Sequence, residues 1–271
     1  MEREPDPATA RVRALHQISD IGFRQAMEDR HVLEIRPRVG LFGGVFDGHG
    51  GTEAAEILAV SLHQLFFEAL GTGLSPPQAI RQAYRSAEES LQGVESGATA
   101  ATVFLRGDAL SFAHVGDSEI LLVGAGPIAL TRPHRVDDPG ERSRIVAAGG
   151  AIEGGYVVRG VRGLMPTRSF GDSFFRPVGV MAVPVVGERR LGAADRFLVV
   201  ACDGLFDVLG GEEIARTLLQ SSGAHAGGES LREAVLARGG TDNLTILVIE
   251  LDAGLPHRRR TGGSSRARER P

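Results

Sequence analysis

Apolar residues along the chain fall into two patterns, short uninterrupted runs and longer stretches with helical spacing. The short runs are bounded by Gly or Asp, which is typical of strands. The expected strands are His31–Ile35, Leu41–Phe46, Ala100–Leu105, Leu110–Val115, Ile120–Val123, Phe197–Ala201 and Leu244–Leu251. Because three of these runs follow one another across short Gly-containing turns, the pattern predicts hairpins and antiparallel sheets.

The longer stretches repeat their apolar residues every three or four positions, as amphipathic helices do. Thr52 stands where it can cap the first helix. The second begins with a capping box, Ser75-Pro76-Pro77-Gln78, with proline at the first helical position. Further helices are expected at about 138–148, 211–221 and 229–237. Together the elements predict an α/β (α+β) domain in which helices cover antiparallel sheets.

The chain is expected to form one domain over residues 14–252, because it has no internal repeat and no linker rich in Pro, Gly or Ser. Residues 1–13 and 253–271 have no apolar periodicity and are expected to be disordered tails. No stretch reaches 18 uninterrupted apolar residues, and the N-terminus is charged. We therefore expect a cytoplasmic protein without a membrane span.

Composition excludes several chemistries. The 271 residues contain no Lys, so Schiff-base lysines, phosphate-loop lysines and kinase ATP-anchoring lysines are ruled out. Cys202 is the only Cys, which excludes an intrachain disulfide and finger-type zinc sites. The net charge of -4 combines an Arg-rich end, residues 254–271, with a more acidic body. An acidic body argues against a nucleic-acid partner.

Four Asp residues stand at the ends of expected strands. Asp47 follows LFGGVF, Asp117 follows LSFAHVG, Asp203 follows FLVVAC, and Asp242 precedes NLTILVIEL. If these carboxylates converge at one sheet edge they repel one another without cations, and their hard oxygen atoms select Mg²⁺ or Mn²⁺. Each Asp taken singly is also a common turn residue, so the metal hypothesis rests on the grouping.

Two neighbouring residues extend the hypothesis around Asp47. Its segment, GGVFDGHGG, places glycines on both sides, which frees the Gly48 carbonyl to face a metal. His49 then stands close enough to give a proton to a leaving oxygen. The alternative for His49 is a solvated side chain after a turn.

The segment RQAMED places the Arg24 guanidinium four residues before two adjacent carboxylates, Glu28 and Asp29. A guanidinium binds phosphate with two parallel hydrogen bonds, so this spacing suits phosphate capture beside a metal ligand. The alternative is a charged surface stretch.

Eight ordered blocks of the chain resemble the metal-dependent serine/threonine protein phosphatases of the PP2C (PPM) family. The resemblance spans about residues 15–250. The blocks are GFRQAMEDRH (22–31), VFDGHGG (45–51), SGATAA (96–101), HVGDS (114–118), AAGG (147–150), TRSFGD (167–172), VACDGLFDV (200–208) and GGTDNLT (239–245). The resemblance implies a four-layer α-β-β-α sandwich of two antiparallel sheets flanked by helices, with a metal cluster at one end.

The resemblance also implies the metal ligands. Asp47 would bridge two Mn²⁺ or Mg²⁺ ions, and the Gly48 carbonyl would bind one of them. Asp203 and Asp242 would hold the other ion. Glu28 would bind the first ion, either directly or through a water molecule.

The remaining roles carried by the resemblance concern the reaction. Asp117, with Asp203, resembles a third metal site of the family. Asp29 would orient metal-bound water, Arg24 would grip the phosphate, and His49 would be the general acid. A metal-bridging hydroxide would then attack phosphorus directly, without a phosphoenzyme.

The resemblance implies that phosphoproteins made by Ser/Thr kinases are the substrates, and we expect the enzyme to act as a monomer. Two positions depart from the family pattern: Glu119 stands where Arg is usual, and Pro133 stands where an acidic residue is common. Residues 135–175 match the family's flap region. Two interpretations are open for the arginines of this region: they steer acidic or phosphorylated partners, or they form a solvated face. These arginines are Arg135, Arg142, Arg144, Arg159, Arg162 and Arg168.

Two other functions stay open from the sequence. One is a catalytically silent binding module that keeps the sandwich, although the intact metal-ligand pattern argues against it. The other is a Ser hydrolase built on Gly116-Asp117-Ser118, which lacks a block pairing that Ser with a catalytic Asp and His. A cysteine phosphatase is disfavoured, because Val208 stands where Arg would be needed six residues after Cys202, and Cys202 is expected to be a packed strand-end residue.

Overall fold

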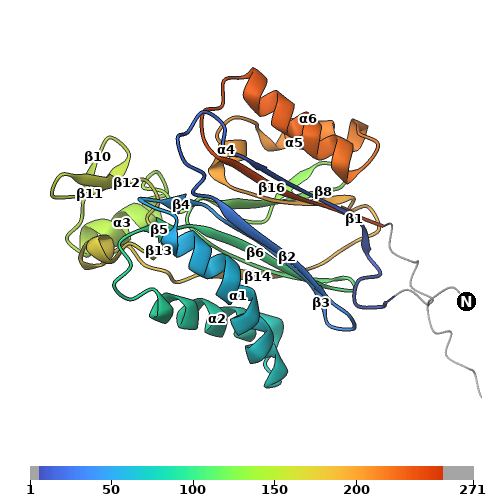
Figure 1. Ribbon diagram of the computed structural model, residues 1–271, viewed down its shortest axis with the longest axis horizontal. Helices are drawn as coiled ribbons and strands as arrows, with labels where there is room; N and C mark the ends of the chain where they lie inside the picture. Colours follow the sequence, from blue (N-terminus) through green and yellow to red (C-terminus); the bar gives the residue numbers. More distant parts are fainter. Residues whose placement is uncertain (1–5, 253–271) are drawn as a thin grey trace, which may run out of the picture.

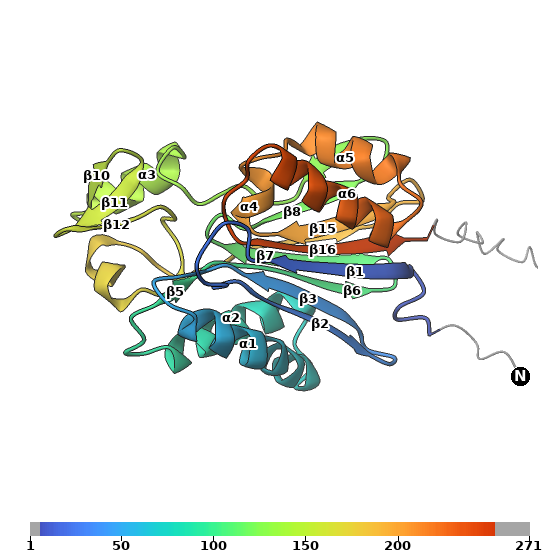
Figure 2. The same cartoon turned by 45° about the horizontal axis from the view of Figure 1, so that its top comes forward.

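A computed structural model describes residues 6–252 of the chain. Two five-stranded antiparallel sheets face each other, with strand orders β1-β16-β15-β8-β9 and β14-β7-β6-β3-β2. Helices cover the outer face of each sheet, which gives four layers (Figures 1 and 2). The predicted α-β-β-α sandwich of two antiparallel sheets is therefore confirmed.

The first sheet has helices α5 and α6 on its outer face (Figure 2). Its strands are β1 (Val12–Asp20), β16 (Leu244–Leu251), β15 (Phe197–Ala201), β8 (Glu119–Val123) and β9 (Pro127–Ala129). The helices of this layer are α4 (Asp203–Phe206), α5 (Gly211–Gln220) and α6 (Ala224–Ala237). α6 begins five residues before the expected 229, because Gly227 and Gly228 interrupt the apolar spacing of its first turns.

The second sheet is covered by two longer helices. Its strands are β14 (Val185–Arg190), β7 (Ala109–Val115), β6 (Ala100–Arg106), β3 (Gly40–Phe46) and β2 (Arg30–Arg36). The helices are α1 (Glu53–Gly71), which follows Thr52 without a capping bond from its side chain, and α2 (Pro76–Ser90). As predicted, Gln78 of α2 accepts a hydrogen bond from the Ser75 backbone N–H.

α1 is long and apolar enough to cross a membrane by length and composition alone. Its apolar face is nevertheless used inside the protein. Leu58, Leu62 and Phe66 are buried, and they belong to one core cluster with Phe42 and Phe104 of the sheet. The helix therefore packs in the way a core helix does.

An apolar cluster lies between each sheet and its helices, and a further one fills the space between the two sheets. In β16, Leu247 and Ile249 belong to this inner cluster, whereas Ile246 and Val248 belong to the cluster under α5 and α6. Successive side chains of a strand point to opposite faces. Both faces of β16 are covered, which explains its uninterrupted apolar run.

The chain changes sheets between β7 and β8. The expected hairpin of 110–115 with 120–123 is wrong, because β7 pairs with β6 and β14 whereas β8 pairs with β15 and β9. Gly116 makes the crossing with φ +95°, and a Cβ there would lie 2.5 Å from the Thr99 side chain. The crossing places Asp117 at the end of the sandwich, between the two sheets.

The flap lies at one end of the sandwich (Figures 1 and 2). Its elements are α3 (Pro139–Ala147), β10 (Ala151–Glu153), β11 (Tyr156–Arg159), β12 (Arg162–Leu164) and the 3₁₀ helix η1 (Ser173–Val178). A small sheet joins it to the sandwich through β13 (Phe170–Gly171), β5 (Gly97–Ala98) and β4 (Gly48–His49). The flap has its own apolar core around Ile145, Val157 and Phe175.

Regular structure begins before residue 14, the expected start of the domain. β1 starts at Val12, and the buried Arg11 donates hydrogen bonds to Asp108 and to the Gly192 carbonyl, each at 3.0 Å. These hydrogen bonds connect the residue before β1 to the loops that contain Asp108 and Gly192. The expected tail 253–271 and residues 1–5 lie outside the described part of the chain.

Candidate active site

Three of the strand-end carboxylates meet at the flap end of the sandwich. Asp47 follows β3 of one sheet, Asp203 follows β15 of the other, and Asp117 lies in the crossing between β7 and β8. One oxygen atom from each of these side chains lies within 4.8 Å of the other two. The two facing sheets therefore bring together side chains that are far apart in the chain.

These carboxylates are electrostatically unfavourable together. Burial, and then the charges of Asp29, Asp203 and Asp117, raise the pKa of Asp47 well above its usual range. Burial and the neighbouring Asp117 raise the pKa of Asp203 to about 7. Buried like charges favour protonation unless a cation neutralises them. The cluster therefore has the electrostatics of a cation site.

Asp29 gives independent support for a cation or an ordered water at this place. Its side chain is buried, and within residues 6–252 its Oδ2 atom has no hydrogen-bond partner. Burial raises the pKa of this carboxyl group. Buried polar atoms of folded proteins nearly always have a partner, and Thr245, Cys202 and Asp47 are the side chains that lie next to this carboxyl group. A cation or water in the cluster would supply a further partner. The surrounding donors are oxygen atoms, which fit Mg²⁺ or Mn²⁺.

Glu28 and Gly48 lie against each other at the edge of the cluster. A Cβ on Gly48 would come within 2.5 Å of the Glu28 carbonyl oxygen, so only glycine allows this approach. The Glu28 side chain accepts a hydrogen bond from the Gly51 N–H at 2.7 Å. This contact orients the carboxylate from the loop that also carries Asp47.

His49 is paired with a residue that the sequence analysis did not assign to the site. Its Nε2 atom lies 2.7 Å from Oδ2 of Asp172, which is buried and has φ +47°. Burial alone would lower the pKa of His49, but the hydrogen bond and charge of Asp172 raise it above the usual value. Gly97 makes room for the pair, since a Cβ there would lie within 2.3 Å of both side chains. The available signal was the block TRSFGD, which ends in Asp172.

Arg24 and Asp242 form a pair at the entrance to the cleft. Arg24 Nη2 donates to Asp242 Oδ2 at 2.6 Å, and more than half of the Arg24 side chain is exposed. An anion that enters from solvent can therefore reach the Arg24 guanidinium.

Asn243 holds the loop that carries Arg24 and Glu28. Its Oδ1 accepts a hydrogen bond from the Glu28 N–H at 2.8 Å. Its Nδ2 donates to the carbonyls of Ile21 and Ala26 at 2.9 and 3.0 Å. Nothing in the sequence pattern predicted this role, although Asn243 directly follows Asp242.

Arg135 reaches from the flap into the acidic cluster. Its Nε donates to Asp117 at 2.7 Å, its Nη2 donates to Asp203 at 2.9 Å, and Asp207 accepts from both terminal nitrogens. Arg135 thus neutralises part of the charge that burial leaves uncompensated. For this residue neither steering of partners nor a solvated face is the right interpretation, because its guanidinium is bound by carboxylates.

Most of the other flap arginines also have structural partners. Arg144 and Arg168 both pair with the buried Glu141, and Arg159 donates to the Phe174 carbonyl. Only Arg142 and Arg162 of this set are exposed. Most of the positive charge that the sequence suggested for the flap surface is therefore bound by other groups of the protein and does not face solvent.

The cluster opens into a cleft of about 1030 Å³ between the sandwich end and the flap. Arg24, Glu28, Asp47, His49, Asp117, Asp203 and Asp242 all line this cleft. On the flap side it is lined by Tyr156, Arg162 and Phe174. Every residue that the sequence analysis assigned to the site lines the cleft, except Asp29, which is buried behind it.

Two other chemistries do not fit the structure. Ser118 is completely buried and hydrogen-bonds to Thr99 Oγ1 at 2.6 Å, so a Ser hydrolase using this residue is ruled out. Cys202 is also completely buried, where its Sγ donates to the Asn243 carbonyl and accepts from the Thr245 N–H. Its interpretation as a packed strand-end residue is confirmed.

Residues 16–244 match the family model described as "Protein phosphatase 2C". The chain is 35% identical over 244 residues to "Probable protein phosphatase 2C 59" of Arabidopsis thaliana, which covers 85% of this chain and 77% of that protein. It is 34% identical over 251 residues to the human "Protein phosphatase 1F", covering 84% of this chain and 55% of the relative.

A solved structure agrees with this match at the level of the fold. The serine-threonine phosphatase 2C of Toxoplasma gondii superposes with a TM-score of 0.74 at 22% sequence identity, covering 89% of this chain and 97% of that chain. The family match runs from within β1 to the first residue of β16, and this range includes the residues named above that line the acidic cleft. The chain therefore belongs to the protein phosphatase 2C family.

Proposed function

We propose that this protein is a metal-dependent phosphatase that hydrolyses phosphoserine and phosphothreonine in proteins. The proposal rests on one observation: oxygen atoms of Asp47, Asp117 and Asp203 meet at the floor of a cleft. Arg24, which would bind the phosphate, and His49, which would donate the proton, line the same cleft. Family membership supports phosphatase activity, and the cleft supplies the groups that such an activity needs.

The metal-binding residues divide into two groups. Glu28, Asp47 and the Gly48 carbonyl would hold one Mn²⁺ or Mg²⁺ ion, and Asp47, Asp203 and Asp242 would hold a second. Asp117 and Asp203 would be available to a third. The bound ions would supply Lewis acidity and lower the pKa of the water that attacks phosphorus.

The protein's own groups would orient the phosphate and the leaving group. Arg24 would exchange its hydrogen bond to Asp242 for two parallel bonds to phosphoryl oxygens, where it neutralises the charge that develops during transfer. His49 would donate a proton to the departing serine or threonine oxygen. Asp172 supports this role, because its carboxylate raises the pKa of His49. Asp29 would accept a hydrogen bond from the attacking water.

The reaction would proceed without a phosphoenzyme. Ser118 and Cys202, the nucleophilic side chains nearest in sequence to Asp117 and Asp203, are fully buried and engaged in hydrogen bonds. With these two side chains out of reach, a water molecule activated by the bound ions would be the nucleophile. The exposed Arg162 and the Tyr156 ring on the flap would contact the polypeptide around the phosphorylated residue. Substrates made by Ser/Thr kinases, a monomeric state and a cytoplasmic location remain predictions.

The test is hydrolysis of p-nitrophenyl phosphate and of a phosphothreonine peptide, with Mn²⁺ and then with a chelator. We expect activity that requires the ion and disappears in Asp47→Asn and Asp203→Asn, because each substitution removes a charged ligand. Asp137→Asn is the matched control, since Asp137 is an exposed flap carboxylate that does not line the cleft. A folded protein without activity at saturating Mn²⁺ and Mg²⁺ would instead be a silent binding module.

A further inference from the structure

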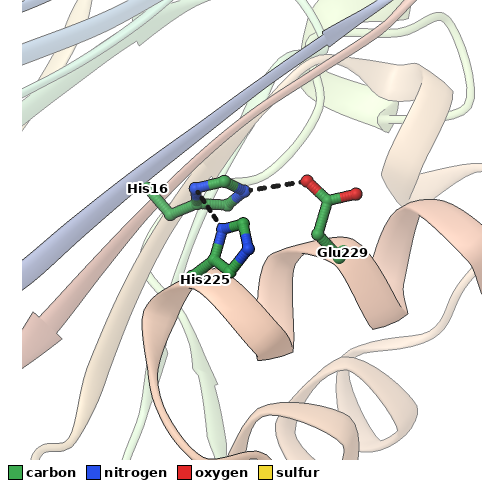
Figure 3. A group of neighbouring side chains, drawn as sticks. All are labelled: His16, His225 and Glu229. Atoms are coloured by element: carbon green, nitrogen blue, oxygen red, sulfur yellow. Dashed lines mark hydrogen bonds and ion pairs between the residues drawn. The ribbon is translucent and has the colours of Figure 1, made fainter.

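A second group of metal-ligating side chains lies where α6 packs on β1. It consists of His16 on β1 and of His225 and Glu229 on α6 (Figure 3). One ligand atom from each side chain lies within 4.8 Å of the other two. None of the three residues lines the acidic cleft, and the proposed phosphatase reaction uses none of them.

The secondary structure explains why these side chains meet. His225 and Glu229 are four residues apart on one helix and therefore lie on the same face. On β1, His16 alternates with Ala14 and Ile18, which pack in the core cluster beneath α6. His16 therefore points toward the helix that carries the other two residues.

A glycine of α6 makes the close approach possible. A Cβ on Gly228 would lie 2.7 Å from Cδ2 of His16, so any larger residue would displace the imidazole ring. Glycine is unfavourable inside a helix. Gly228 therefore lowers the stability of α6 but allows His16 to lie against the helix.

The three side chains are close enough to share one tetrahedral ion after a rotation of His225. His16 Nε2 lies 3.1 Å from Glu229 Oε1, and His16 Nδ1 lies 3.2 Å from His225 Nδ1 (Figure 3). Two ligands bound to one tetrahedral zinc ion lie about 3.4 Å apart. Since an ion takes only one nitrogen of His16, the exposed His225 side chain would rotate to complete the set.

Arg232 orients the carboxylate of this group. Its Nη1 lies 3.9 Å from Glu229 Oε2, while its Nε donates to Asp20. The Oε1 atom of Glu229 is thereby turned toward His16. At 3.9 Å the contact is an ion pair and not a hydrogen bond, and it places a positive charge on the side of Glu229 away from His16.

We propose that His16, His225 and Glu229 form a surface Zn²⁺ site whose fourth position is taken by water. Two imidazoles and a carboxylate form a donor set that zinc prefers, whereas the oxygen donors of the cleft suit Mg²⁺ and Mn²⁺. The ion would link α6 to β1 and so stabilise the helical layer on the first sheet. A simpler explanation of the same distances is a hydrogen-bond chain in which His225 donates to His16 and His16 donates to Glu229.

The experiment separates these explanations by calorimetric titration of Zn²⁺ into the full chain carrying Asp47→Asn and Asp203→Asn, in excess Mg²⁺. These two substitutions weaken Zn²⁺ binding in the cleft. The Zn²⁺ binding that remains is therefore assigned to His16, His225 and Glu229. We expect one ion per chain, with affinity reduced at least about tenfold by His225→Ala or Glu229→Gln. Zn²⁺ should also raise the Tm, and each of these two substitutions should remove that increase.

Glu233→Gln is the matched control, because Glu233 is exposed one turn further along α6. It should leave both the affinity and the Tm increase unchanged. Circular dichroism checks that each variant is folded, which is expected for His225→Ala since His225 is exposed. Equal zinc affinity in His225→Ala and Glu233→Gln, or a folded protein that binds no zinc, would overturn the proposal in favour of the hydrogen-bond chain.

Discussion

His49 Nε2 lies 2.7 Å from Asp172 Oδ2, although 123 positions separate the two residues in the chain. The carboxylate raises the pKa of an imidazole whose burial would otherwise lower it. It also occupies Nε2, which leaves Nδ1 as the nitrogen that can deliver a proton. Asp172 is therefore a positioning residue for the proposed general acid.

Asp172→Asn should lower the pKa of His49, because burial then acts without the opposing carboxylate. His49 must be protonated to act as an acid, so activity should decline at a lower pH than in the unmodified protein. The loss should reach about tenfold to hundredfold for phenyl phosphate at neutral pH. It should be much smaller for p-nitrophenyl phosphate, whose leaving group needs no proton. The measurement is kcat against pH for both substrates.

Asp137→Asn serves as the control for Asp172→Asn, since it removes an exposed carboxylate of the same flap. Its pH profile should match that of the unmodified protein with both substrates. An equal loss of activity on phenyl phosphate and p-nitrophenyl phosphate in Asp172→Asn would contradict the acid-positioning role and indicate a general disturbance of the cleft.

Arg135→Gln should destabilise the protein in the presence of a chelator. Arg135 pairs with both Asp117 and Asp203, and removing one partner of such largely buried ion pairs costs on the order of 3 kcal/mol of unfolding free energy. Mn²⁺ should restore more stability to this variant than to the unmodified protein, because the released carboxylates can bind the ion. Urea unfolding with chelator and with Mn²⁺ measures both effects.

Arg142→Gln provides the comparison for Arg135, because Arg142 is an exposed arginine of the neighbouring helix α3. Its unfolding midpoint should stay the same under both conditions. If the midpoint of Arg135→Gln also stayed the same in chelator, the ion pairs of Arg135 would contribute nothing to stability.

Asn243→Ala should reduce activity chiefly through the loop that carries Arg24 and Glu28. The substitution removes one acceptor and two donors, which leaves the Glu28 N–H and the Ile21 and Ala26 carbonyls without these partners. We expect weaker Mn²⁺ activation, with the half-saturating concentration raised about tenfold or more. Asn243→Asp keeps the acceptor and should recover part of this loss. Equal Mn²⁺ activation in Asn243→Ala and the unmodified protein would contradict the idea.

The stacked pair His114 and His134 should make stability depend on pH. Their rings lie 4.2 Å apart, and burial lowers the pKa of His114 to about 4 and that of His134 to about 3. Below about pH 6.5 the unfolded chain takes up protons that the folded protein does not. Stability should therefore be complete above this pH and fall by about 3 kcal/mol for each histidine, or about 6 kcal/mol for the pair, towards pH 4.

His134→Asn should flatten this pH dependence. Asn does not titrate, and its Oδ1 can accept the Gly116 N–H bond that His134 Nδ1 accepts at 3.1 Å. The difference between the two unfolding profiles isolates the histidine contribution from that of the carboxylates. Profiles that run parallel from pH 7 to pH 4 would show that His134 does not contribute to the pH dependence.

The metal-binding candidates could be predicted from local sequence, because Asp47, Asp203 and Asp242 stand beside strands with strong apolar runs. A strand end and a turn residue are both local features. The layered fold followed from the family resemblance. The hairpin between β7 and β8 was predicted wrongly, because alternation along a strand does not reveal which sheet the strand joins.

The residues that support the site could not be predicted in the same way. Asp172 sits in a left-handed conformation before a short 3₁₀ helix, without a regular pattern around it. Arg135 is one of six arginines in the flap, and its contacts cross from the flap to residues of both sheets. Such roles depend on tertiary contacts between distant segments, which periodicity does not encode.

The position of the acidic cluster between two sheets has a consequence for the lifetime of the protein. Asp47 and Asp203 come together only after both sheets have docked, so divalent ions held by this cluster would bind the folded chain and not the unfolded one. At an ion concentration one hundred times Kd, this linkage adds about 2.7 kcal/mol to the unfolding free energy. The unfolded population, and with it the rate at which a protease attacks unfolded chains, then falls about a hundredfold. The supply of divalent ions would therefore control how long the protein survives as well as how fast it works.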